Sequence, residues 1–266
     1  MTSLTLTKHH GLGNDFLVVF DPDVDDLPSL ARRICDRRRG VGADGLLVGE
    51  SAAGYAARMV LFNADGSRAE MSGNGIRCFA QALAARRGDM MTQLILTDAG
   101  ERRVDLADAD EPDTILATVE MGSVDPLEEP EGWAELGCHP DRPVAHLSLG
   151  NPHSVVGVDQ VAVVELAELG AKVPQVNLEI VEPGPQQHEI RMRVHERGAG
   201  ITEACGTGAC AAAHAAARWG LATPADGKLV VHMDGGSATV ELDTPMVGHV
   251  TLTGPATHVA TIGIRL

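Results

Sequence analysis

Alternating hydrophobic and polar residues run along most of the chain and predict a protein built mainly from β-strands. A period of two residues is typical of a strand that buries one face. In the first half, strands are predicted over 2–7, 16–20, 45–50, 57–62, 93–98, 102–107 and 114–122. In the second half, strands are predicted over 144–150, 154–158, 176–181, 188–196, 228–233, 238–243, 249–254 and 258–266.

Three segments follow a helical pattern instead. Residues 27–39 read as an amphipathic helix that ends at Gly40. Residues 72–87 and 205–219 each begin with a Gly-x-Gly turn and continue with helix-forming residues. The last of these, which contains "CAAAHAAARW", is apolar almost all round, as is typical of a buried helix. We therefore expect one central helix in each half of the chain, enclosed by strands.

This repeated plan predicts two pseudo-symmetric lobes. The expected fold class is α/β, with each lobe a mostly antiparallel β-sheet or barrel wrapped around a central α-helix and the active site in the cleft between the lobes. Residues 122–143 hold four prolines and a cluster of acids, which suggests an inter-domain link or a long connection. The N-terminal lobe is predicted over 1–122, to which the C-terminal strand 256–266 can return, and the C-terminal lobe over 123–255.

Composition narrows the class of partner. The 266 residues are 44% hydrophobic and 22% charged, which is a globular composition, and the net charge is −16. A field of that sign repels nucleic acid and anionic membrane surfaces. No apolar run is long enough to span a membrane, and the N-terminus lacks a signal-peptide pattern. With an odd number of cysteines, five, we expect a cytoplasmic protein with reduced thiols and a small-molecule or protein partner.

The two Gly-x-Gly turns are the strongest candidates for chemistry. "MSGNGIRC" at 71–78 places Ser72 before its turn, and "CGTGAC" at 205–210 places Cys205 there. A helix N-terminus presents unpaired backbone N–H groups and a positive dipole end, which bind carboxylates and phosphates. The same position lowers the pKa of a cysteine. For a single turn a plain N-cap explains the residues equally well, whereas two copies favour a functional pair.

Several asparagines lie where they can bind a polar ligand. Asn14 lies in the Gly-rich turn of "HHGLGNDF", Asn63 and Asn151 each come directly after a strand, and Asn177 lies inside one. A plain Asx turn explains any one of them. Buried amides need partners, so several of them converging on a cleft suit a zwitterionic ligand.

Three ionisable residues complete the set. Glu196 and Arg197 end a strand shortly before the Cys205 turn. The arginine can pair with a carboxylate through two hydrogen bonds, and the glutamate can orient or deprotonate a neighbour. His153 follows a proline, where a surface histidine is the commoner finding.

Cofactor and metal patterns are weak. "GVGADG" at 40–45 matches a dinucleotide pattern in form, but it follows a helix instead of a strand, so we interpret it as a loop and expect no nucleotide cofactor. The 11 histidines and five cysteines show no CxxC, HxxxH or HExxH spacing. No metal site is therefore expected.

The motifs together resemble the diaminopimelate epimerase family, in the family's order and from end to end. The matching blocks are "KHHGLGNDFLVV", "GVGADGLLV", "NADGSRAEMSGNGIRCFA", "GNPHSVV", "VNLEIV" and "ERGAGITEACGTGACAAAHAA". The resemblance implies an isomerase that inverts one α-carbon without a cofactor, interconverting LL- and meso-diaminopimelate for lysine and peptidoglycan synthesis. It also implies independence from pyridoxal phosphate, with a homodimer as a candidate assembly.

The resemblance assigns roles to individual residues. The family uses two cysteines, one heading each turn, as the base and the acid on opposite faces of the carbon, and Cys205 matches one of them. His153 and Glu196 match residues that assist the pair. The substrate-binding positions match Asn14, Asn63, Asn151, Asn177, Glu196 and Arg197, and the carboxylate-binding turns match Gly73, Asn74, Gly206 and Thr207.

Ser72 departs from the family, which usually has its second cysteine there. Cys78 does not replace it, because it lies within the helix beyond the turn. A hydroxyl is a poor free base, although it can relay a proton if a neighbour such as His153 acts as the base.

Three hypotheses follow from this departure. The chain is an epimerase with a Ser/Cys pair, a superfamily relative that acts on another amino acid such as a proline derivative or eliminates water, or a non-catalytic amino-acid-binding protein. The asparagines and Arg197 discriminate between them, because a distal amino-acid head group needs such residues and a proline does not.

Overall fold

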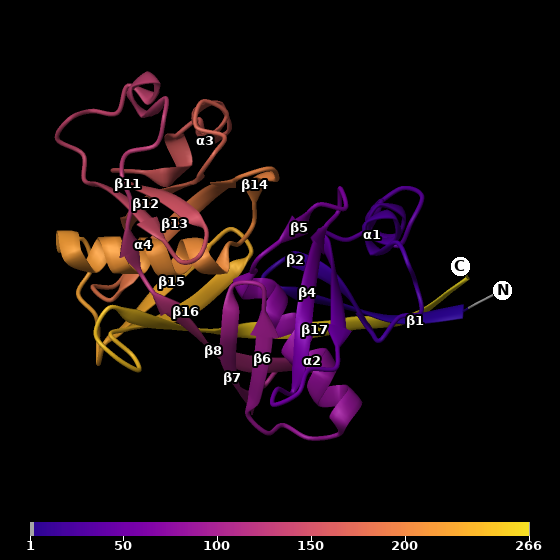
Figure 1. Cartoon of the computed structure of the whole chain (residues 1–266). Coiled ribbons are helices and arrows are strands. Elements are labelled where there is room, and N and C mark those ends of the chain that lie inside the picture. The colour runs from indigo at the N-terminus through magenta and orange to yellow at the C-terminus, as the bar shows by residue number, and fades with distance from the viewer. Residues whose placement is uncertain (1–2, 266) are drawn as a thin grey trace. The chain divides into compact units, whose positions relative to one another are not determined.

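The computed structural model describes residues 3–265, which form two compact units. Unit 1 comprises the chain up to Val119 together with the chain from Gly254 onward, and unit 2 comprises Glu120–Thr253. Strands β8 (Thr114–Ser123) and β17 (His249–Arg265) carry the chain from one unit to the other (Figure 1). The units meet at 119/120 and 253/254, and the boundaries expected from the sequence are 122/123 and 255/256.

Unit 1 is built around helix α2 (Gly73–Arg87). Its other elements are β1 (Ser3–Gly11), β2 (Asn14–Phe20), α1 (Leu27–Cys35), β3 (Gly45–Glu50), β4 (Ala57–Asn63), β5 (Arg68–Ala69), β6 (Gln93–Thr97) and β7 (Gly100–Asp108). Its strands pair in the order β1–β2–β3–β4–β6–β7–β8–β17, and β17 pairs with β1 again. The sheet therefore closes on itself.

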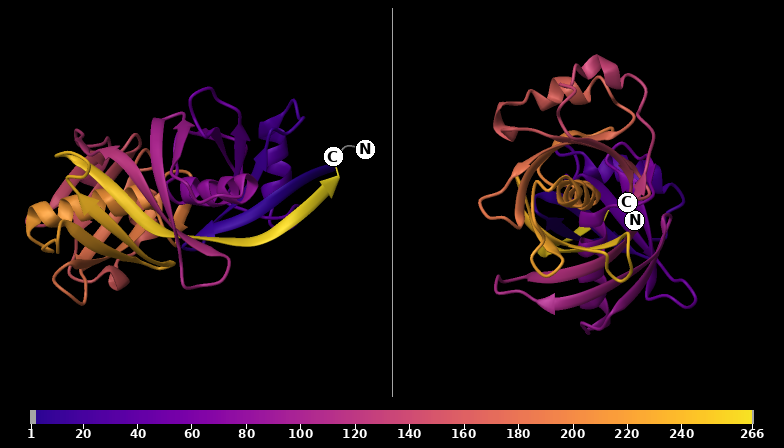
Figure 2. Two further views of the ribbon diagram at one scale, coloured as in Figure 1. Left: turned by 90° about the horizontal axis from the view of Figure 1, so that it is seen from below. Right: turned by 90° about the vertical axis from the view of Figure 1, so that its left-hand side faces the viewer.

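Unit 2 repeats this arrangement around helix α4 (Gly206–Trp219). Its other elements are β9 (Asp125–Pro126), η1 (Trp133–Leu136), β10 (Val144–Ser148), β11 (Pro152–Gly157), η2 (Val161–Val163), α3 (Leu166–Gly170), β12 (Asn177–Pro183), β13 (Glu189–Glu196), β14 (Gly200–Thr202), β15 (Lys228–Met233) and β16 (Gly236–Leu242). The strands pair in the order β9–β10–β11–β12–β13–β15–β16–β17, and β17 pairs with β8. The right-hand view of Figure 2 shows α4 end-on, with strands of its unit curving around it.

Both central helices are buried, as expected for helices enclosed by a sheet. Residues 209–213 of α4 have no exposed surface, and their small side chains allow the strands to pack closely around the helix. Helix α2 is buried from Gly73 to Ala84, including the charged side chain of Arg77. The α/β fold class with a central helix in each lobe is confirmed. No helix in the described part of the chain is long and apolar enough to cross a membrane.

Some predicted elements differ from the observed ones in extent or number. Helix α1 ends at Cys35, earlier than expected, because the Asp36 side chain accepts the backbone N–H groups of Arg38 and Arg39 and closes a turn. The two strands expected near the C-terminus are the single strand β17, apart from residue 266, which lies outside the described residues. This strand pairs with β16 up to Thr253 and with β1 from Thr257, so the proline between these segments interrupts neither ladder.

The acidic, proline-containing segment 122–143 lies within unit 2, so it is a long connection of that unit and not a link between units. It contains β9 and the η1 turn. Trp133 in this turn is buried in a cluster with Val156, Leu166 and Ile180. The chain passes between the units along regular strands instead.

Candidate active site

The two Gly-x-Gly turns start their helices with the same backbone geometry. Ser72 is the N-cap of α2 with φ −141° and ψ 122°, and Cys205 is the N-cap of α4 with φ −129° and ψ 114°. The Ser72 hydroxyl accepts the N–H of Gly75 over 3.0 Å, and Cys205 Sγ accepts the N–H of Gly208 over 3.4 Å. The first-turn N–H groups that have no partner within the helix give each turn the means to bind an anion.

Cys205 lies at one end of a chain of hydrogen bonds in unit 2. Thr207 Oγ1 lies 3.5 Å from Cys205 Sγ, and Asn151 Nδ2 donates to Thr207 Oγ1 over 3.2 Å. His153 Nε2 lies 3.0 Å from Asn151 Oδ1, and His153 Nδ1 lies 2.6 Å from Glu179 Oε1. The chain therefore joins four residues predicted from the sequence to a carboxyl group that was not predicted.

His153 and Glu179 are both fully buried, which rules out the alternative that His153 is a surface histidine. Burial raises the pKa of Glu179, and the charge of Glu196 adds to this rise, while His153 acts in the opposite direction. The surroundings of Glu179 therefore favour the protonated form of its carboxyl group more than water does.

Cys205 is also buried, and burial raises the pKa of its thiol well above the ordinary value. The carboxylates of Glu196 and Glu179 raise it further, whereas the hydrogen bonds of Thr207 and Gly208 lower it without reversing the direction. The expectation that the helix N-terminus makes this cysteine a ready thiolate is wrong for this structure. Cys205 is held as a thiol, the form that can deliver a proton.

The other unit 2 candidates meet at the end of β13. Glu196 accepts a hydrogen bond from the Thr202 hydroxyl, and Asn177 Oδ1 accepts the backbone N–H of Arg197 over 2.9 Å. The Arg197 side chain is exposed, and it makes no hydrogen bond or ion pair with residues 3–265. Its guanidinium is therefore available for a ligand carboxylate.

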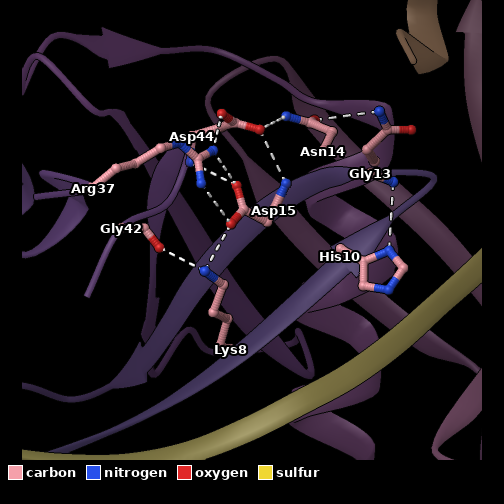
Figure 3. Close-up of polar contacts among 9 residues, drawn as sticks. Lys8, His10, Gly13, Asn14, Asp15, Arg37, Gly42 and Asp44 are labelled. Carbon is pink, nitrogen blue, oxygen red and sulfur yellow. Dashed lines mark hydrogen bonds and ion pairs between the residues drawn. The ribbon is translucent and has the colours of Figure 1, made fainter. Parts of the chain in front are cut away.

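In unit 1, Asn14 is anchored by a cluster of charged residues at the start of β2 (Figure 3). Its Nδ2 donates to Asp44 Oδ2 over 2.7 Å. Arg37 lies between Asp44 and Asp15, with Nη2 2.7 Å from one oxygen of each, and Lys8 Nζ lies 2.8 Å from Asp15. Because its amide nitrogen is held by Asp44, Asn14 presents its oxygen to other partners.

Asn74 and Arg77 connect Asn14 to the first turn of α2. Asn74 Nδ2 donates to Asn14 Oδ1 over 3.3 Å, and Arg77 Nη2 donates to Asn74 Oδ1 over 2.8 Å. Arg77 Nη1 also donates to the Gly73 carbonyl over 3.0 Å. Because Arg77 is fully buried, its positive charge acts on this turn with little screening and favours an anion there.

Asn63 lies at the end of β4 and pairs with Gly45 at the start of β3. Its Nδ2 donates to the Ser67 hydroxyl over 2.9 Å, within its own hairpin. It is exposed and adjoins the loop that carries Asp44, without taking part in the hydrogen-bond chain from Asp44 to Arg77.

The predicted residues thus form two groups, one in each unit. The unit 1 group holds Asn14, Ser72, Gly73 and Asn74, with Asn63 beside it, and the unit 2 group holds Asn151, His153, Asn177, Glu196, Arg197, Cys205, Gly206 and Thr207. Sequence reasoning missed Asp15, Arg37, Asp44, Arg77 and Glu179. A charge inside an otherwise apolar segment, as in "GIRCFA" and "VNLEIV", was the available sign for Arg77 and Glu179.

The sequence model of the family described as diaminopimelate epimerase matches residues 6–126 and 146–259. The chain belongs to the diaminopimelate epimerase family. A diaminopimelate epimerase from Synechococcus elongatus is 40% identical, over 97% of this chain and 96% of its own length. The resemblance inferred from the six sequence blocks is confirmed.

Solved structures outside the diaminopimelate epimerase family share the fold. A PhzF-family phenazine biosynthesis protein from Bacillus anthracis aligns with a TM-score of 0.77 at 16% identity, over 100% of both chains. A hydroxyproline epimerase from Agrobacterium vitis aligns with a TM-score of 0.72 at 16% identity, over 99% of this chain and 93% of its own. At such identities the likeness shows the fold alone. Within residues 3–265, no three His, Cys, Asp or Glu residues are grouped to hold a metal ion.

Proposed function

We propose that this member of the diaminopimelate epimerase family interconverts LL- and meso-diaminopimelate by removing the α-proton from one face of the carbon and returning a proton to the other. The observation that carries the proposal is the matched pair of turns, headed by Ser72 and Cys205, each of which presents a proton-carrying side chain at a helix N-terminus. Membership of the family supports diaminopimelate as the substrate.

Binding of the substrate carboxylate by the two turns makes it easier to remove the α-proton of the substrate. The α-proton of an amino acid is far less acidic than any protein side chain, so the negative charge that develops must be stabilised where it spreads into the carboxylate. Backbone N–H groups at helix N-termini are fixed donors suited to this task. Buried Arg77 adds a positive charge behind the first turn of α2.

In one direction of the epimerisation, Cys205 acts as the acid. As a base on the other face takes the α-proton, the C–H electron pair moves onto the α-carbon and its carboxylate. The Cys205 thiol then gives its proton to the carbon and becomes a thiolate, which is the base for the reverse direction. On the other face, the Ser72 hydroxyl relays the proton: it receives the α-proton and at the same time passes its own proton to the base beyond it, because the hydroxyl is too weak an acid to stay ionised by itself.

The remaining polar residues hold the distal head group of the substrate. The exposed guanidinium of Arg197 pairs with the distal carboxylate, and amide oxygens accept hydrogen bonds from the ammonium. The amides assigned to this role are those of Asn14, Asn63, Asn151 and Asn177, whereas Asn74 belongs to the carboxylate-binding turn of α2. A proline derivative has no distal amino-acid group, so this set favours diaminopimelate.

The proposal includes catalysis without pyridoxal phosphate, a cytoplasmic location and a homodimer. Pyridoxal phosphate enzymes bind their cofactor through a lysine, and no lysine contacts the turn of Ser72 or Cys205 in the described chain; the three lysines are Lys8, Lys172 and Lys228. The five cysteines are free thiols, in agreement with a reducing compartment. Light scattering of the purified protein measures the assembly.

The decisive experiment is incubation of LL-diaminopimelate with the protein in deuterated water. We expect α-deuterium in the meso product, because the proton returned to carbon comes from an exchangeable group. Proline and hydroxyproline are run in parallel. Exchange with these alone would assign the chain to another substrate, and binding of diaminopimelate without exchange would leave a binding protein.

A further inference from the structure

Glu179 is a buried carboxyl group outside the predicted site. It lies on β12, two residues after Asn177, and is 0% exposed. One of its oxygens contacts His153, while Oε2 is buried without a hydrogen-bond partner among residues 3–265. A carboxyl group with a single partner is costly to bury, so its position calls for a functional explanation.

Helix α4 leaves room for this carboxyl group at Gly208. A Cβ atom added to Gly208 would lie 2.7 Å from Glu179 Oε1, so a larger residue would push the carboxyl away. Gly208 is also the residue whose N–H donates to Cys205 Sγ. The carboxyl group therefore packs against the same turn that holds the reacting sulfur.

The contacts define the direction of donation along the chain. His153 Nε2 faces the oxygen of the Asn151 amide, which only accepts, so Nε2 carries a hydrogen. His153 Nδ1 and Glu179 Oε1 are 2.6 Å apart, close enough to share a proton. Asn151 in turn donates to Thr207, which leaves the hydroxyl hydrogen of Thr207 to point at Cys205 Sγ.

We propose that Glu179 is a positioning residue for Cys205. The proton it shares with His153 keeps Nε2 of the ring as a donor to Asn151. This fixes the direction of the hydrogen bonds from Asn151 to Thr207 and from Thr207 to the sulfur. The Thr207 hydroxyl then stabilises the thiolate that forms when Cys205 gives up its proton. The inference rests on the proposed function for the role of Cys205 as an acid, but its tests measure the thiol and the imidazole directly.

The charged groups around Cys205 come from three strands. Glu196 lies on β13, Glu179 on β12 and His153 on β11. Glu196 raises the pKa of Cys205 more than Glu179 does, and Glu179 shares its proton with His153. Loss of the Glu179 charge alone would speed alkylation of the sulfur, whereas loss of its hydrogen bonds would slow it, so the two effects differ in sign.

The first experiment compares Glu179→Leu with Glu179→Gln. Leucine fills the space without hydrogen-bonding groups, whereas glutamine can still donate to His153 Nδ1 and keep Nε2 as a donor. Alkylation of Cys205 by iodoacetamide is followed across a pH series by mass spectrometry of its peptide. At a pH of about 8 we expect alkylation to be about tenfold slower in the leucine variant and within about twofold of wild type in the glutamine variant.

Glu189 provides the matched control. It is another buried glutamate of unit 2, and its Oε2 lies 3.0 Å from Nε2 of His232, outside the chain that reaches Cys205. Glu189→Leu should leave the alkylation rate unchanged. Equal acceleration in both variants at position 179 would show that Glu179 acts as a charge that raises the pKa of Cys205. Equal slowing, or wild-type rates in both, would show that it does not position the sulfur through His153; each of these results overturns the proposal.

A second measurement uses the wild-type protein, so it does not depend on a variant folding. With histidine labelled by ¹⁵N, the ring nitrogens of His153 are observed by NMR near neutral pH. We expect a hydrogen on Nε2. A bare Nε2 would overturn the proposal while leaving the deuterium-exchange result, and with it the proposed function, untouched.

Discussion

The Ser72 turn and the Cys205 turn share a backbone conformation but differ in the charge behind them. A fully buried arginine, Arg77, donates to the first turn of α2. A fully buried glutamate, Glu179, packs against the first turn of α4. One turn is therefore supported by a cation and the other by a carboxyl group whose pKa is raised by burial.

An asparagine from outside the helix contacts each turn, and the two amides point in opposite directions. The oxygen of Asn14 accepts from Asn74 and its nitrogen donates to Asp44, whereas the nitrogen of Asn151 donates to Thr207. Hydrogen-bond donation therefore runs away from the α2 turn in unit 1 and toward the sulfur in unit 2. Under the proposed function, both turns bind the carboxylate, and the second also stabilises charge on its N-cap atom.

The largest test of this difference is Cys205→Ala, which removes the atom at the end of the unit 2 chain. We expect kcat/KM for diaminopimelate to fall by at least about 10³-fold, the scale of a lost acid–base group. Cys138→Ala is the control, since Cys138 belongs to the same unit but not to this chain. A rate near wild type without Cys205 would mean that another residue handles this proton.

Ser72 tests the other side of the comparison. Ser72→Ala should lower kcat by about 10²-fold, while Ser72→Cys keeps or raises it, because a thiol carries a proton more readily. The alanine variant also loses an N-cap worth about 1 kcal/mol. Asp26→Ala, which removes the N-cap of α1 that accepts from Ser29, should cost similar stability without changing the rate. If Ser72→Ala is as active as wild type, Ser72 relays no proton.

A buried histidine of unit 1, His9, makes the stability of the protein depend on pH. His9 pairs with the neutral amide of Gln81, and burial lowers its pKa from 6.5 to about 4. As pH falls from 6.5 toward 4, the unfolded chain takes up a proton that the folded protein excludes, so the free energy of unfolding falls by up to about 3 kcal/mol.

Urea unfolding followed by circular dichroism measures this pH dependence. His9→Gln should flatten the decline below a pH of 6.5, whereas replacement of the exposed His139 by glutamine should not. Equal slopes for the His9 variant and wild type would show that His9 is protonated in the folded protein.

The smallest expected effect concerns the anchor of Asn14. Asp44→Ala frees the Asn14 amide, and we expect KM to rise by about five- to tenfold with kcat little changed, the size of one charge-assisted hydrogen bond. Asp105→Ala, which removes a similar surface contact with Arg103, should change neither constant. A fall in kcat at constant KM would instead place Asn14 in transition-state stabilisation.

Local patterns were enough to predict the turns and the central helices. A glycine turn followed by helix-forming residues predicts the starts of α2 and α4, and β3 lies at the expected residues. These features depend on neighbours in the chain, which the sequence displays directly.

Contacts between distant segments could not be predicted in the same way. Glu179 meets His153 because β11 and β12 pair in a register that sets His153 opposite Asn177. The pKa of Cys205 is raised by burial and by carboxylates from other strands, so it depends on the folded surroundings and not on the helix end alone. Asp44 lies in a loop that resembled a nucleotide-binding pattern, and its role appeared only through its contact with Asn14.

Strand β17 has a consequence for the order in which a ribosome can complete the two units. Unit 2 needs β17 only up to Thr253, whereas unit 1 closes only when the segment from Thr257 onward pairs with β1. Because synthesis proceeds from the N-terminus, unit 2 can close its sheet before unit 1, although most of unit 1 is made first. During translation, β1 and its neighbours must wait with an open edge, which is a point where a chaperone can bind the growing chain.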